Sequence, residues 1–382
     1  MKNRFKDNFL AAQKSTYLFS AAVSPLHRRV YEKRLKHLDM MFTQGDIHWH
    51  HSIEEMEVTR HRVAELFNAK NEDIAFGSNT SMNMNLLAMM YKQKGEGYNV
   101  VIPEDEFPSS SLPWYHHGFE VRRVASQKSF ISIEDILNLC DEKTLAVAHS
   151  HVQFATGFRQ DLQELGSQLK KRQIDLIVNA TQSIGVFPID VERYNITALV
   201  ASGHKWLCMG YGLSVAYMNL NLRNRFKAPV CGWLSVENMS NMSSYPSPLK
   251  STASVLETGV PPFHILTGLS TALEVVKEEG IENIAQQILS TRRYLIQELQ
   301  KIDLSLISYD DTKDDVYSSH NSGNILIQVQ GFKETPEQIL EKLAEDHIYV
   351  SLRNGGLRIA IHYFNDCSDV DRLVEKLSLL LN

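Results

Sequence analysis

Short apolar segments that are typical of buried strands alternate with helix-period segments along the first half of this chain. A sheet whose strands alternate with helices in this way is mostly parallel and is covered by helices, so the pattern predicts an α/β fold. Polar residues follow several of the strands, which places the expected site at the carboxyl edge of the sheet. The strands are expected near 100–103, 145–148, 176–179, 199–202 and 213–217, and the helices near 53–70, 80–93 and 160–172.

The pattern changes near residue 220, which predicts a second structural unit. Residues 220–255 are loop-like and rich in Asn, Ser and Pro, and a long helical pattern then covers about 265–299. Further strands are expected at 323–329, 347–351 and 357–361, and a closing helix at 368–381. We therefore expect an N-terminal segment of residues 1–20, a large domain of residues 21–255 and a small α+β domain of residues 256–382.

The composition argues against several function classes. The chain has 382 residues, of which 43% are apolar and 22% charged, so it can bury a large core. A formal net charge of -6 disfavours a nucleic-acid partner, and no segment approaches the roughly 20 apolar residues that span a bilayer. The four cysteines lie far apart without a C-x-x-C pair, which argues against disulfides and a thiolate zinc site and predicts a reducing, cytoplasmic compartment. They are Cys140, Cys208, Cys231 and Cys367.

The segment Leu199-Val-Ala-Ser-Gly-His-Lys205-Trp206 places a lysine directly after a predicted buried strand. Burial of a lysine is costly, and desolvation lowers its pKa so that the neutral amine can attack an aldehyde. Ser202 and His204 beside it are donors that suit a phosphate. An isolated lysine after a strand is more often an exposed turn residue, so this interpretation depends on the neighbouring motifs.

An apolar strand with polar residues at its end lies upstream of this lysine, in Leu176-Ile-Val-Asn179-Ala-Thr-Gln182. The asparagine and the glutamine are suited to hydrogen-bond a ring nitrogen and a phenolic oxygen. Polar residues also end many strands only because they form turns. Alone, the segment is therefore weakly informative.

A third polar segment, Gly77-Ser-Asn79-Thr80-Ser81, leads into the helical pattern that begins near Met82. Amide and hydroxyl residues at a helix start are common N-caps. Free backbone N–H groups and the positive end of the helix dipole also bind phosphate at such a position. Both interpretations can hold together.

Taken together, these segments resemble the class V aminotransferase and cysteine desulfurase superfamily, which has fold type I and uses pyridoxal 5'-phosphate. The resemblance covers nearly the whole chain, and the order and spacing of the blocks are those of the family. It implies a large domain with a mostly parallel sheet and a small C-terminal α+β domain. The matching blocks are Asn79-Thr80-Ser81, Glu106-Phe107-Pro-Ser-Ser-Ser-Leu-Pro113-Trp114, Ser150-His151-Val152 with Thr156-Gly157, Asn179-Ala-Thr-Gln182-Ser-Ile-Gly185 with Pro188-Ile-Asp190, Ser202-Gly-His204-Lys205-Trp206, Leu256-Glu257-Thr-Gly259 and Leu357-Arg358-Ile-Ala.

The resemblance also implies which residues bind the cofactor. Lys205 corresponds to the lysine that forms the Schiff base and then moves the Cα proton of the substrate. Gln182 corresponds to the residue that hydrogen-bonds the ring hydroxyl, and Phe107 to the aromatic ring that stacks on the pyridine, although a lone Phe is more often a core residue. The phosphate positions are those of Thr80, Ser81, Ser202 and His204.

Two further residues are expected to contact the substrate. Arg358 resembles the family's substrate-carboxylate arginine, and its planar fork suits bidentate capture of an α-carboxylate; a structural ion pair is the alternative. His151 is the second residue expected at the substrate. By analogy with the family, we expect a homodimer with shared active sites and a small amino-acid substrate.

The sequence departs from the family pattern at the pyridine nitrogen, where Asn179 replaces the usual aspartate. A neutral amide leaves the ring nitrogen largely unprotonated and weakens the cofactor as an electron sink. We therefore expect slow or no amino transfer, whereas racemisation or β-elimination should suffer less. Loss of catalysis is a further alternative.

Two other departures concern sulfur transfer and the dimer. Desulfurases of the superfamily carry a nucleophilic cysteine on a mobile loop before the carboxylate arginine, but residues 322–356 contain none. Cys208 is expected to be a packed structural residue. The sequence thus predicts that the chain is not a persulfide-forming cysteine desulfurase. Val260 replaces a hydroxyl residue that commonly reaches the partner's phosphate, which puts that contact in doubt.

Metal and nucleotide binding are disfavoured. The segment His48-Trp49-His50-His51 is dense in histidine, but no H-x-x-x-H helix motif is present, and we expect no metal site. Neither a GxGxxG motif nor a P-loop occurs. The leading hypothesis is a pyridoxal-phosphate-dependent enzyme of the class V aminotransferase type that acts on an amino acid. The alternatives are a carbon-sulfur lyase or epimerase on the same scaffold, or a non-catalytic protein that retains the cofactor.

Overall fold

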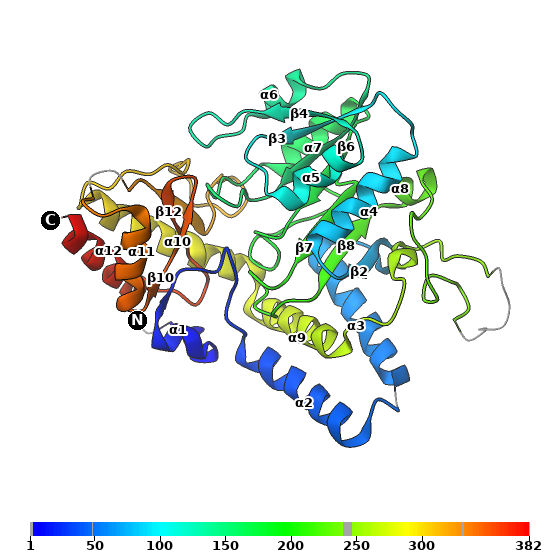
Figure 1. Ribbon diagram of the computed structural model, residues 1–382, viewed down its shortest axis with the longest axis horizontal. Coiled ribbons are helices and arrows are strands. Elements are labelled where there is room, and N and C mark those ends of the chain that lie inside the picture. Colours follow the sequence, from blue (N-terminus) through cyan, green and yellow to red (C-terminus); the bar gives the residue numbers. More distant parts are fainter. Residues whose placement is uncertain (1–2, 48, 240–246, 330–331, 382) are drawn as a thin grey trace.

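A seven-stranded sheet forms the centre of the protein, whose computed structural model describes residues 3–47, 49–239, 247–329 and 332–381 (Figure 1). Its strands are β2 (Ile74–Gly77), β3 (Asn99–Pro103), β4 (Glu120–Val124), β5 (Thr144–Ser150), β6 (Asp175–Asn179), β7 (Ala198–Ser202) and β8 (Ser214–Met218). The strand order is β2-β8-β7-β6-β5-β3-β4. Strands β7, β6, β5, β3 and β4 are parallel, whereas β8 is antiparallel to β7 and β2. The predicted α/β class and mostly parallel sheet are confirmed.

Alternate strand residues pack into two apolar clusters, one on each face of the sheet. Val100 and Ile102 of β3 belong to the cluster that includes residues of α4 and α5, whereas Val101 belongs to the cluster that includes residues of α3, α7 and α9. This alternation follows from the two-residue period of a strand. The covering helices are α3 (Trp49–Phe67), α4 (Thr80–Lys92), α5 (Pro108–His116), α7 (Leu162–Lys171) and α9 (Phe263–Glu279).

The C-terminal part forms a second, smaller sheet that lies to one side of the first (Figure 1). Its antiparallel strands are β9 (Asn324–Ile327), β11 (Ser351–Arg353) and β12 (Gly356–Ala360), in the order β11-β12-β9. The helices around it are α10 (Ile281–Gln300), α11 (Pro336–Glu345) and α12 (Cys367–Leu381). The N-terminal segment joins this part, because β1 (Thr16–Tyr17) pairs with β10 (Ile348–Tyr349) in parallel.

The helical pattern expected over 265–299 forms two helices, α9 and α10, with a break at Gly280. Gly280 has a φ of 78°, which is unfavourable for residues with a Cβ, and its N–H closes the last turn of α9 on Val276. Helix α9 packs on α2 (Arg28–Gln44) and α3, whereas α10 packs mainly on α12. The division at residues 255 and 256 stays a prediction.

The remaining helical elements are short. They are η1 (Lys6–Asn8), α1 (Leu10–Lys14), η2 (Asn71–Asp73), α6 (Ile133–Asn138), α8 (Leu220–Arg225) and η3 (Ala253–Leu256). Within the described ranges, every helix is too short or too polar to cross a lipid bilayer.

Candidate active site

A cavity of about 270 Å³ lies at the carboxyl edge of the parallel strands, where ligands of such sheets bind. The ends of β5, β6 and β7, the start of α4 and the β11–β12 hairpin contribute to its wall. The structure brings nearly all of the predicted site residues together here: Thr80, Ser81, Phe107, Asn179, Gln182, Ser202, His204, Lys205 and Arg358. The other lining residues are Ala21, Ala22, Asn79, Ser109, Ser150, Phe154, Thr181 and Arg353.

The amine of Lys205 lies in this cavity. The residue follows β7 directly, and its Nζ lies 5.4 Å from the ring centre of Phe107. Burial, with smaller contributions from the charges of Arg358 and Arg353, lowers the pKa of Lys205 from 10.5 to about 7. A large fraction of the amine is therefore neutral and nucleophilic at neutral pH.

The start of α4 and the end of β7 form a set of hydroxyl and amide donors. The Oγ1 of Thr80 lies 2.7 Å from the Oγ of Ser202 and 3.1 Å from the Oγ1 of Thr181. Asn79 caps α4 by accepting from the backbone N–H of Met82 over 2.9 Å. Hydroxyls and a positive helix end at one place suit a phosphate.

His204 is held beside these donors by stacking on Tyr211, with ring centres 5.0 Å apart. Burial and the charge of Lys205 lower the pKa of His204 to about 4. The imidazole is therefore neutral at pH 7 and offers one N–H donor.

The amide of Asn179 has a fixed orientation. Its Oδ1 accepts from the backbone N–H of Thr181 over 2.9 Å, and its Nδ2 donates to the Oγ of Ser110 over 2.8 Å. A side-chain amide has two N–H donors, so one N–H of Nδ2 remains for a ligand. This donor matches a ring nitrogen that is not protonated.

The amide of Gln182 is also held in place. Its Oε1 accepts from Trp206 Nε1 over 2.8 Å and from Asn324 Nδ2 over 3.3 Å, while its Nε2 donates to the Ala21 carbonyl over 2.9 Å. The second N–H of Nε2 is the remaining donor, which suits a phenolic oxygen.

Arg358 reaches the cavity from β12 and is almost completely buried, with 1% of its surface exposed. Its Nε donates to Ser351 Oγ over 3.0 Å, and its Nη1 donates to the carbonyl of Phe154 over 2.7 Å. Its Nη2 is buried and has no hydrogen-bond partner among the described residues. The structural ion pair weighed as an alternative is absent from the described part of the chain. A ligand carboxylate would satisfy this donor.

The structure does not bring His151 to this cavity. Ser150 lines the cavity, whereas His151 lines a separate one together with Arg159 and Tyr194. Neighbouring residues in extended backbone point to opposite sides, which explains the separation. Burial holds the pKa of His151 well below its usual range. We therefore do not assign His151 to the substrate.

Sequence reasoning assigned no role to several contributors to the site, among them Ser110, Phe154, Thr181 and Arg353. A signal for Arg353 was present, because Asn354-Gly355 is typical of a two-residue hairpin turn. The two turn residues have φ values of 46° and 75°, as such a turn requires. Nothing in the local sequence distinguishes Ser110 or Phe154 from other residues of their segments.

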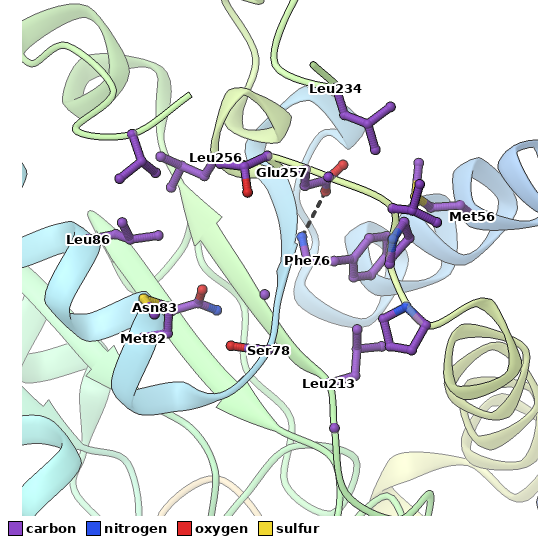
Figure 2. Close-up of a pocket in the computed structure, with 18 residues that line it drawn as sticks. Met56, Phe76, Ser78, Met82, Asn83, Leu86, Leu213, Leu234, Leu256 and Glu257 are labelled. Atoms are coloured by element: carbon purple, nitrogen blue, oxygen red, sulfur yellow. Dashed lines mark hydrogen bonds between the residues drawn. The ribbon is translucent and has the colours of Figure 1, made fainter. Parts of the chain in front are cut away.

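A second cavity, of about 380 Å³ and mostly apolar, begins on the other side of the β2–α4 turn (Figure 2). Gly77 and Ser78 line this cavity, whereas Asn79 lines the first. Figure 2 shows Glu257 bonded to the backbone N–H of Phe76, over 2.8 Å. Both carboxylate oxygens of Glu257 also accept from the buried Arg60, over 2.6 and 2.9 Å. The bond to Phe76 therefore holds Glu257 against β2, and the ion pair holds it against α3.

The histidine-rich segment lies at the start of α3, and the described part of the chain holds no cluster of three or more His, Cys, Asp or Glu side chains suited to a metal. His48 lies outside the described residues. His51 bonds Glu54 on the exposed surface of α3.

The sequence profile of the aminotransferase class-V family matches residues 16–373. The chain belongs to this family. It is 27% identical over 330 residues to an uncharacterized aminotransferase of Schizosaccharomyces pombe, a match that covers 84% of this chain and 80% of the relative. The protein is accordingly a pyridoxal-phosphate-dependent enzyme of the transferase and lyase type.

Two solved structures show that the aminotransferase class-V fold is shared. The apo cysteine desulfurase of Thermococcus onnurineus NA1 superposes with a TM-score of 0.89 at 21% identity, covering 100% of this chain and 98% of that one. The cystine C-S lyase C-DES, in a mutant with glycine covalently linked to its PLP cofactor, superposes with a TM-score of 0.88 at 18% identity, covering 98% of both chains. These likenesses confirm fold type I.

Proposed function

We propose that this class V enzyme acts at the Cα or Cβ of an amino acid, with Lys205 holding the cofactor and moving the Cα proton. The observation that carries the proposal is the buried amine of Lys205, whose pKa of about 7 suits both roles. Pyridoxal phosphate, when bound, withdraws electrons from the substrate carbon. The residues of the chain bind, orient and move protons around it.

The donors of the cavity fit this cofactor. In the proposed assignment, Thr80, Ser81, Ser202 and His204 hold the phosphate at the start of α4, and Gln182 donates to the ring hydroxyl. Phe107 faces the ring, as its position beside the Lys205 amine supports. The unpartnered Nη2 of Arg358 supports its assignment to the substrate α-carboxylate.

Asn179 favours a lyase or epimerase reaction over amino transfer. Its fixed amide presents a donor where a carboxylate would keep the ring nitrogen protonated. A reaction that requires only a brief negative charge at Cα depends less on that protonation. The second candidate is therefore a carbon-sulfur lyase or epimerase, and a non-catalytic protein that retains the cofactor is the third.

We propose that the chain does not form a persulfide on a cysteine of its own. Among the described residues that line the cavity there is no cysteine. Cys208 follows Lys205 closely but is buried, and burial raises its pKa to about 12. Such a thiol is inert as a nucleophile. The four free cysteines also support the proposed cytoplasmic location.

We propose a homodimer because apolar side chains are exposed around the second cavity. Val260, at its rim, is 62% exposed, and Met82 on α4 is 50% exposed. Apolar side chains that are gathered around an apolar cavity are typical of an interface. Equilibrium sedimentation of the holoenzyme tests this assignment, and a monomer at micromolar concentration contradicts it.

The function is tested by the absorbance of the purified holoenzyme beside Lys205→Ala. We expect a visible band in the wild-type protein that borohydride converts to a protein-bound product, and no such product in the variant. Incubation with amino acids then separates the candidates: a lyase yields a keto acid and ammonia without an acceptor, and an aminotransferase requires a 2-oxo acid. A binding protein turns over neither. Absence of a cofactor band after reconstitution overturns the proposal.

A further inference from the structure

A second arginine enters the cavity from the same face of the β11–β12 hairpin as Arg358. In the hairpin register, Arg358 pairs directly with Ser351, and Arg353 pairs with Gly356. Ser351 and Arg353 are two residues apart on β11, so their side chains lie on one face, and the residue opposite Ser351 shares that face. Both arginines line the cavity.

Arg353 has no carboxylate partner in the described part of the chain. Its recorded hydrogen bond runs from Nη1 to the backbone carbonyl of its neighbour Leu352, over 2.6 Å. The described lining of the cavity contains two arginines and Lys205 but no Asp or Glu. A half-buried guanidinium without a counter-charge is costly, so an anion is the ligand that this wall favours.

The other anionic groups expected in the cavity already have their own donors. The start of α4, with Thr80 and Ser202, forms the wall that suits the phosphate. The free Nη2 of Arg358 suits one α-carboxylate. Arg353 therefore remains for a further negative charge, which must lie on the substrate side chain.

We propose that the substrate is an amino acid with an anionic side chain, a carboxylate or a sulfur oxoacid, whose distal charge is bound by Arg353. This inference rests on the proposed function, because it assigns the second charge of a substrate whose α-carboxylate lies on Arg358. Phe107 and Phe154 pack edge to face in the wall of the same cavity, with ring centres 5.2 Å apart, and add apolar surface beside the charged groups. A guanidinium discriminates an anion from its neutral amide most strongly in such surroundings.

The test is a spectral titration of the holoenzyme, which follows the cofactor band as amino acids are added. The panel pairs L-aspartate with L-asparagine, L-glutamate with L-glutamine, and L-cysteine sulfinate with L-alanine. We expect the best anionic ligand to bind at least about tenfold more tightly than its neutral partner, as a charged hydrogen bond allows. The carboxylate and sulfinate arms distinguish the two acid classes.

The variant Arg353→Gln is expected to lower the ratio of aspartate to alanine affinity by about 10- to 100-fold. Arg353→Lys keeps the charge and should retain part of the ratio. Arg193→Gln, which changes an exposed arginine away from the cavity, is the matched control and should leave the ratio as in the wild type. An unchanged cofactor band in each variant shows that the fold is intact.

Two results overturn the inference. Either the neutral amides bind as tightly as the acids, or Arg353→Gln weakens aspartate and alanine by the same factor. In both cases the proposed function is retained if the cofactor band of the wild-type protein still shifts when alanine is added. A holoenzyme without any lysine-bound cofactor band instead contradicts the proposed function itself, and the inference with it.

Discussion

The side-chain nitrogen of Asn179 donates to the hydroxyl of Ser110 over 2.8 Å. The Oδ1 of the same amide is held by the backbone N–H of Thr181. The backbone N–H of Thr181 can only donate, so rotation of the amide would break this bond and place two donors against each other. The chain therefore presents a donor, not an acceptor, at the position expected for the ring nitrogen.

The variant Asn179→Asp should accelerate amino transfer. A carboxylate there favours a protonated ring, and Ser110 and Thr181 can still donate to it, so the fold should tolerate the change. We expect a rise of about tenfold or more, which corresponds to about 1.4 kcal/mol in the barrier. Single-turnover rates with a 2-oxo acid measure it. Rapid amino transfer by the wild-type protein would refute the proposed role of Asn179.

Capture of pyridoxal phosphate by the apoprotein should depend on pH with a midpoint near 7. Because the pKa of Lys205 is lowered from 10.5 to about 7, its amine is mostly protonated and slow at pH 6 and mostly neutral at pH 8. The capture rate should rise about tenfold per pH unit below the midpoint and level off above it. Stopped-flow absorbance between pH 5.5 and 8.5 provides the measurement. A rate that still rises steeply at pH 8.5 would indicate an ordinary lysine.

The variant Arg358→Lys should weaken the binding of every amino acid. A lysine cannot reproduce the fork that bonds Ser351 and Phe154 while leaving Nη2 for the ligand. We expect the dissociation constant to rise by about tenfold or more. Ser351→Ala removes one positioning bond and should cause a smaller loss in the same spectral titration. If the wild-type protein and Arg358→Lys bind amino acids with equal affinity, Arg358 has a structural role and does not bind the substrate.

The variant Glu257→Gln should destabilise the fold. Arg60 is buried and would lose its main counter-charge, while the exposed Glu57 keeps a contact of 3.0 Å. The expected loss in the free energy of unfolding is about 3 kcal/mol, at the low end for an uncompensated buried charge. Urea unfolding measures this loss.

The control is the double variant Arg60→Met with Glu257→Met, which removes both charges and should recover part of the lost stability. A Glu257→Gln protein that is as stable as the wild type would show that the ion pair does not stabilise the fold.

The sequence predicted five of the seven strands of the central sheet, because these five are buried on both faces and are bounded by polar turns. It did not predict the two edge strands, β2 and β4, and the residues of β4 are mostly not buried. The sequence did not predict the break at Gly280, because the apolar period continues across this glycine, although a glycine with a positive φ commonly ends a helix. Tertiary contacts of α9 with α2 and of α10 with α12 set that break. No local pattern encodes them.

Site residues could be predicted from the sequence when they follow a strand or begin a helix, because the local pattern then gives their position. Lys205 and Thr80 are examples. His151 was assigned to the substrate because it belongs to the block Ser150-His151-Val152 that resembles the family. Side chains alternate along an extended segment, so His151 points away from the cavity that Ser150 lines. Arg353 was missed because its proposed role in binding an anion depends on the lack of an acidic partner among the described residues around it. That absence is a property of the folded chain and cannot be read from one segment.

The cavity holds three basic side chains, those of Lys205, Arg353 and Arg358, and their repulsion affects the stability of the folded chain even without a substrate. Like charges that share a wall without a lining carboxylate oppose the folded state. A dianionic cofactor relieves this repulsion, and a ligand at 100 times its dissociation constant adds about 2.7 kcal/mol of stability. We therefore expect the bound cofactor to stabilise the folded chain as a counter-ion, and we expect the abundance of the enzyme in the cell to follow the supply of pyridoxal phosphate.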